Sequence, residues 1–136
     1  MSYGATAALQ QAVFARLTSD PPVTALVGSH IYDALPEGPV PEMYLSIGPE
    51  AVRDRSDKTG SGALHDFAVT VISDAAGFST AKQVAAAVSD ALTGGGIALS
   101  RGVLVSLNFL RARARRVGSG RQIEIWFRAR VDDEIA

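Results

Sequence analysis

The sequence predicts an α+β fold: a mainly antiparallel sheet with two helices packed on one face. Two segments place apolar residues every three to four positions, which is typical of amphipathic helices. Several others alternate apolar and polar residues, which is typical of half-buried strands. Turns rich in glycine and proline separate them, giving the order α-β-β-β-α-β-β. Because 136 residues are about one domain's worth of chain, we expect residues 1–136 to form a single domain.

The first helix is predicted over residues 5–18. Leu9, Val13 and Leu17 recur every four residues and form one apolar stripe. The Asp-Pro-Pro sequence at 20–22 ends the helix, because proline lacks the backbone donor and disfavours helical geometry before it.

Short strands and loops follow the first helix. A short apolar piece at 23–27 leads to residues 31–32, which we expect to form a marginal strand. Three prolines predict a loop over 33–42, and the alternation of residues 43–47 predicts a half-buried strand. The charged segment 53–62 ends in Gly-Ser-Gly and predicts a mobile hairpin loop.

The second helix is expected to follow a strand over residues 64–73. Ser79 or Thr80 can cap its first turn, and the apolar stripe runs to Leu92. The glycine run at 94–96 ends it, since glycine accepts the left-handed geometry common after a helix.

Two arginine-rich strands, 103–115 and 121–131, complete the sheet around a Gly-Ser-Gly turn at 118–120. Alternation in the first strand predicts a core face that consists of Val103, Val105, Leu107 and Phe109. Phe109 is therefore expected to be buried. The same face then continues as Arg111, Arg113 and Arg115. Either a β-bulge near residue 110 shifts the register, or the hairpin projects beyond the core.

Trp126 falls on the polar face of the last strand, opposite the predicted core face. Tryptophan and arginine are enriched at interface hot spots, so this position indicates an interaction surface. The alternative is that Trp126 stacks under an arginine of its own subunit or is covered by a helix.

Charge is unevenly distributed along a chain whose net charge is −1. Residues 20–74 carry nine acidic and three basic residues, whereas residues 101–131 carry eight arginines and one glutamate. The two segments either neutralise each other on folding, or form complementary surfaces for neighbouring copies, or the basic one binds nucleic acid. Direct sequence-specific nucleic-acid binding is disfavoured, because the chain is slightly acidic and few aromatic residues accompany the arginines.

The residues for catalysis or metal binding are scarce. The chain has no cysteine and two histidines, His30 and His65, at most half of a metal site. His65 and Asp66 are neighbours on a strand and point to opposite faces, so they do not form a catalytic pair. The glycine clusters lack the lysine of a phosphate-binding loop. We therefore expect no enzymatic activity, no cofactor and no metal.

The apolar runs of the chain are short. They predict neither a membrane span nor a secretory signal.

The sequence resembles the tail-terminator, or tail-completion, proteins of long-tailed phages, prophages and gene transfer agents. The resemblance is carried by the segment Val-Gly-Ser-His-Ile-Tyr-Asp-Ala-Leu-Pro at 27–36, by Pro41 before the strand at Met43, and by the strand at 65–73 followed by Phe78 and a helix. It covers most of the chain.

The resemblance implies a non-enzymatic structural protein of the virion or a virion-like particle, assembled in the bacterial cytoplasm. It implies a homo-oligomeric ring, six-fold in related terminators, on the head-proximal end of the tail tube. Such a ring ends tube growth and joins the tail to the head connector, while DNA passes through its lumen without sequence-specific binding. The alternatives are another connector or tail-tube subunit and, less favoured, a nucleic-acid-binding module.

Charge and pattern alone indicate which side chains contact a neighbouring subunit, the tube or the connector. They lie in the charged loop, at the hairpin tip and on the arginine-rich strands. The candidates are Arg53, Arg55, Asp57, Lys58, Arg111, Arg113, Arg115, Arg116, Trp126, Arg128 and Arg130.

Overall fold

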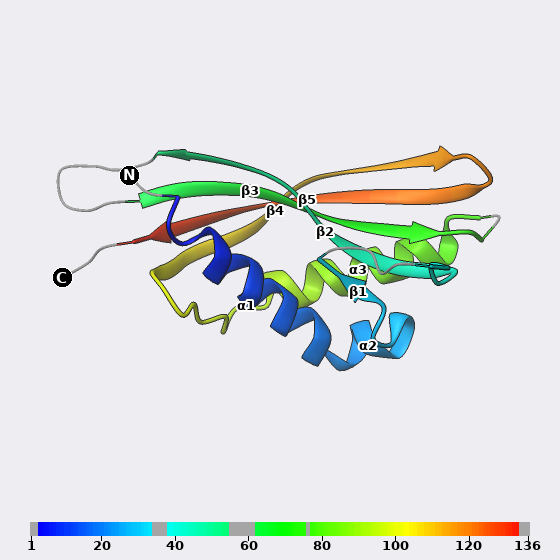
Figure 1. Cartoon of the computed structure of the whole chain (residues 1–136), viewed down its shortest axis with the longest axis horizontal. Helices are drawn as coiled ribbons and strands as arrows, with labels where there is room; N and C mark the ends of the chain where they lie inside the picture. The colour runs from blue at the N-terminus through cyan, green and yellow to red at the C-terminus, as the bar shows by residue number, and fades with distance from the viewer. Residues whose placement is uncertain (1–2, 34–37, 55–61, 76, 134–136) are drawn as a thin grey trace.

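The computed structural model, which describes residues 3–33, 38–54, 62–75 and 77–133, is an α+β fold, as predicted. Its elements are α1 Thr6–Ser19, α2 Pro21–Val27, β1 Ile31–Tyr32, β2 Met43–Asp54, β3 Gly62–Ser73, α3 Ser79–Thr93, β4 Val103–Val117 and β5 Gly120–Asp132. The five strands form one sheet in the order β1-β2-β3-β5-β4, in which only β1 runs parallel to its neighbour. All three helices lie on one side of this sheet (Figure 1). The other face of the sheet, which no helix covers, is called the open face below.

The core lies between the helices and the sheet. From α1 it takes Leu9, Val13 and Leu17, the stripe that the four-residue spacing predicts. The stripe of α3 and alternate residues of β3 and β5 complete it, and Phe127 at its centre is fully buried. Burying a side chain the size of Leu17 contributes roughly 1.5–3 kcal/mol. The apolar faces thus fix the helices onto one side of the sheet.

A third helix, α2, was not predicted from the sequence. The side chain of Asp20 caps it by accepting a hydrogen bond from the backbone N–H of Val23 (3.3 Å). The two prolines occupy its first turn, where no intrahelical donor is needed. The Asp-Pro-Pro sequence therefore ends α1 and also starts α2, which stops at Gly28 with a φ of 60°.

The start of α3 differs from the prediction. Ser79 already lies inside the helix, and neither Ser79 nor Thr80 caps it; the residue at the cap position is Phe78, with no side-chain cap hydrogen bond. Contacts of the Phe78 ring with the core, Lys82 and Arg121 hold this end instead. At the other end Gly94 remains right-handed, and the positive φ values fall on the next two glycines.

Strand β2 is longer than predicted. Its register shifts between Ile47 and Glu50, around Gly48 and Pro49, and pairing with β3 then continues to Asp54. A proline cannot donate to the ladder, so it interrupts the strand as a bulge. The remainder of the predicted loop, 55–61, lies outside the described residues.

The hairpin of β4 and β5 closes tightly, because Val117 pairs with Gly120 and only two residues form the turn. Its first turn residue, Gly118, has a φ of 60°, which glycine adopts without strain. β4 is an edge strand along its whole length. The end of the hairpin rises away from the helix layer (Figure 1).

Candidate functional site

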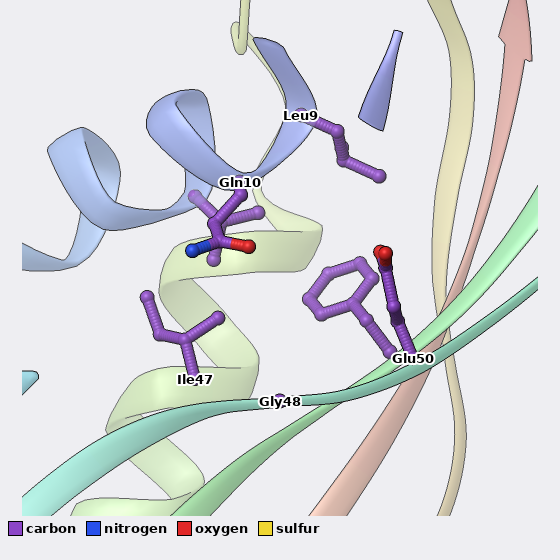
Figure 2. Close-up of a pocket in the computed structure, with 7 residues that line it drawn as sticks. Leu9, Gln10, Ile47, Gly48 and Glu50 are labelled. Atoms are coloured by element: carbon purple, nitrogen blue, oxygen red, sulfur yellow. The ribbon is translucent and has the colours of Figure 1, made fainter. Parts of the chain in front are cut away.

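A pocket between α1 and β2 is too small for an organic ligand. Leu9 and Gln10 on the helix point toward Ile47 and Glu50 on the strand (Figure 2). The cavity holds about 30 Å³, which is the scale of one water molecule. Glu50 accepts hydrogen bonds from the Tyr3 and Thr6 hydroxyls, and these bonds tie the start of α1 to β2.

His65 is a core residue on the helix-covered side of the sheet. Its side chain is fully buried, and within the described residues neither ring nitrogen has a hydrogen-bond partner. Burial lowers the pKa of His65, although the nearby charge of Glu50 opposes the shift. Asp66 points to the open face, as alternation predicts, so the two do not form a pair.

The described residues offer no metal site and no membrane-spanning helix. No group of three histidine, cysteine, aspartate or glutamate side chains lies close enough to hold an ion among them. None of the three helices combines the length and apolar character needed to cross a bilayer.

The open face carries an ion pair between neighbouring strands. Arg128 donates two hydrogen bonds to Asp66, from Nε at 2.8 Å and from Nη2 at 2.9 Å. The two residues face each other in the register of β3 and β5. The hydrogen bonds from Arg128 lower the pKa of Asp66 and outweigh the effect of partial burial. This pair could not be read from the sequence, because it depends on that register.

Trp126 lies beside this pair and is contacted by its own chain. The Arg111 guanidinium sits over the indole ring, 5.2 Å from its centre, and the indole N–H donates to the Glu124 carboxylate at 2.6 Å. Arg111 and Trp126 are direct partners in the pairing of β4 with β5. Trp126 therefore stacks under an arginine of its own subunit, which is the alternative to an interaction surface that the sequence left open.

The predicted core face of β4 is confirmed at Leu107 and wrong at Val103, Val105 and Phe109. The register shifts at two places, between Leu104 and Ser106 and between Phe109 and Arg111. The second shift is the bulge that the sequence allowed near residue 110. Each extra residue exchanges the two faces of the strand. The side chains packed against the core are consequently Leu104 and Leu107.

Three of the predicted core residues are exposed instead: Val103, Val105 and Phe109. Phe109, expected to be buried, is 52% exposed, although its ring edge meets Phe127. β4 lies at the edge of the sheet, where one side of each residue faces solvent. Phe109 is therefore an exposed aromatic side chain on the arginine-rich strand.

The bulges place most of the candidate arginines on the open face. Arg111, Arg113 and Arg115 pair with Trp126, Glu124 and Gln122 and so share their face. Arg128 and Arg130 lie on the same face of β5, and Arg53 on the same face of β2. Arg116 points to the opposite side of β4. Arg55, Asp57 and Lys58 lie outside the described residues.

The largest group of exposed apolar side chains also lies on β4. Five of the eight large hydrophobic residues exposed in the described chain belong to this strand: Val103, Val105, Phe109, Leu110 and Val117. Val105 and Leu110 are the extra residues of the two bulges. The sequence signal for this surface is the mostly apolar segment 103–110 before the arginines, whose odd-numbered positions were predicted to be core.

Comparisons with known proteins identify the family of this chain. The family model described as "Tail completion protein gp17" matches residues 11–132. A search of curated proteins finds no match. Among solved structures, a chain in the virion of a native gene transfer agent particle is 58% identical, with a TM-score of 0.91. That alignment covers 96% of this chain and 99% of the other. The chain belongs to the tail completion protein gp17 family.

Proposed function

We propose that this protein forms a ring on the head-proximal end of a tail tube, ends tube growth and joins the tail to the head connector. Its family makes it a structural protein of phage-type tails. The terminator role and the ring go beyond that family membership. We also propose that residues 1–136 act as one domain and that the site of action is the head–tail junction.

One observation carries the proposal: the near full-length similarity to a chain of a gene transfer agent virion. At 58% identity over 96% of the chain, two proteins share their fold. This supports a place in a virion-like particle for the protein described here. A structural role also agrees with a surface on which arginine and apolar side chains, rather than a deep pocket, are the prominent features.

A ring needs heterologous contacts, in which one patch meets a different patch on the next copy. The separation of acidic and basic residues along the chain supplies two such patches. Charge complementarity mainly aids encounter and register, while apolar burial supplies most of the holding energy. Six copies, as in related terminators, would leave a lumen through which DNA passes without base-specific contacts.

Contacts with the tube and connector are assigned to two charged segments. One starts at Arg53, near the end of β2, and continues in the sequence through Arg55, Asp57 and Lys58; the other is the end of the β4–β5 hairpin, with Arg116. Loops carry binding residues more often than the elements that they connect.

The direct test adds the purified protein to growing tail tubes and measures tube length by electron microscopy. A terminator stops growth and caps one end of each tube. Growth that continues to the length seen without the protein contradicts the proposal. Filaments formed by this protein alone would identify it as a tube subunit instead.

A further inference from the structure

We infer that the free edge of β4 docks onto the α2 side of a second copy of this chain. The inference rests on the proposed ring and names the two surfaces that would build it. The β4 edge consists of Val105, Phe109 and Leu110 with Arg113, Arg115 and Arg116. The α2 side consists of acidic residues in the hollows beside that helix: Asp20, Glu42 and Asp90.

Exposed apolar side chains on β4 are the first observation. Val105 and Phe109 are each 52% exposed and Leu110 is 36% exposed, on a strand with no pairing partner on its outer side. A long edge strand with apolar side chains is a site for association with another chain. The two bulges interrupt its ladder, so the contact is made by side chains rather than by a full added strand.

Arginines without ion partners are the second observation. Arg113, Arg115 and Arg116 are exposed, and no ion pair within the described residues involves any of them. In contrast, Arg128 pairs with Asp66 and Arg101 pairs with Asp133. The intramolecular salt bridges therefore leave a positive cluster at the hairpin end of β4.

Acids without ion partners lie beside α2. Glu42 and Asp90 are exposed and take part in none of the ion pairs of the described chain. Asp90 lines a shallow hollow between α2 and α3 together with Asp20, and Glu42 lines another beside the end of α2. Both hollows also contain apolar side chains, so they offer apolar contact beside negative charge.

The two surfaces lie on opposite sides of the molecule. β4 is one edge of the sheet, whereas α2 packs against β2, next to the other edge. A contact between opposite sides is heterologous, and its repetition generates a ring when the rotation closes. A symmetric contact of β4 with β4 centred on its hairpin end would oppose arginine to arginine and is disfavoured by like charge.

The test uses two charge-reversed variants and their mixture. Arg113→Glu/Arg115→Glu reverses the β4 edge, and Glu42→Lys/Asp90→Lys reverses the α2 side. Each variant alone is expected to fall to the 14.2-kDa monomer at a concentration where the wild type is assembled, as measured by light scattering. An equimolar mixture is expected to regain the wild-type mass, because each reversed surface then meets its complement on the other variant.

Control variants distinguish loss of the contact from a general effect of net charge and from misfolding. Ala7→Glu/Gln11→Glu lowers the net charge at exposed positions of α1, away from both surfaces, and is expected to assemble like the wild type. Leu110→Lys is expected to block assembly, whereas Phe14→Lys, at a residue of similar exposure on α1, is not. Thermal melts of the monomeric variants should match one another, since all these side chains are exposed.

Four outcomes would overturn the inference. Reversed variants that assemble like the wild type would exclude these surfaces and leave the ring proposal intact. Failure of the mixture to recover would exclude their pairing. A wild-type chain that stays monomeric at millimolar concentration would exclude this contact, while the tube-growth assay would still test the terminator role. Normal assembly with loss of salt-dependent DNA binding in Arg113→Glu/Arg115→Glu would assign the arginines to nucleic acid.

Discussion

Strands β3 and β4 flank the same strand, β5, yet their surroundings are opposite. In β3 every residue is buried except Asp66 and Ile72, which are half-buried. In β4 no residue is buried, and only Leu104 and Leu107 are even half-buried. Both strands nevertheless contain several large apolar side chains.

The comparison shows that the fold of one chain explains the apolar residues of β3 but not most of those of β4. The apolar residues of β3 are accounted for by the helix layer and by two neighbouring strands. On β4, Leu104 and Leu107 pack against the core, and the other apolar residues have no such cover within the described chain. A strand with this composition at an exposed edge indicates that a second molecule completes its surroundings.

The largest expected effect comes from removing the aromatic ring of β5 that packs against β3. Phe127→Ala should lower the free energy of unfolding by about 3–5 kcal/mol, because it removes a fully buried ring that stacks on Phe67. Phe109→Ala, on the exposed strand, should cost less than half as much. Urea denaturation of both monomeric variants measures the contrast, and equal losses would show that β4 is as much a part of the core as β3.

A smaller effect concerns the buried imidazole of β3. Burial lowers the pKa of His65 below its ordinary 6.5, so the unfolded chain binds a proton more readily than the folded one. The stability due to neutral His65 is present above pH 6.5 and is lost progressively as the pH falls below that value. His65→Leu should flatten the decline in melting temperature between pH 7.5 and 5.5. An unchanged decline would assign it to other groups.

The smallest effect concerns the ion pair on the open face. Arg128 lowers the pKa of Asp66 below its ordinary 3.8, so the stabilisation is present above pH 3.8 and is lost as the pH falls through the lowered pKa. Asp66→Asn should therefore be less stable than the wild type at pH 6, and the difference should shrink at lower pH. A difference that does not depend on pH would mean that shape, not charge, matters at this position.

Periodicity was sufficient to predict both long helices, the strands and the placement of helices on one face. Leu9, Val13 and Leu17 are buried as the four-residue spacing requires. The helix α2 was missed because it has only seven residues and begins with two prolines, which are commonly read as loop residues. The resemblance to known terminators, carried by residues 27–36, by Pro41 and by the strand at 65–73 with the following Phe78, predicted the family before the fold was known.

The proposed interaction surface was harder to predict, because the side chains that share a face depend on strand register. A bulge adds one residue without changing the local alternation, so Phe109 and Arg111 look alike in the sequence but face opposite sides of the sheet. The contacts of Trp126 with Arg111 and Glu124 likewise follow from strand pairing. The roles of the candidate arginines in contacts with a neighbour remain predictions.

Hydrogen exchange measured on the dilute monomer and on the assembled protein tests the central claim most directly. Amides of β3 should exchange slowly in both states, because the strand is paired on both sides. Outward amides of β4 should exchange quickly in the monomer and become protected on assembly, together with residues around α2. Assembly without added protection on β4 would contradict the account.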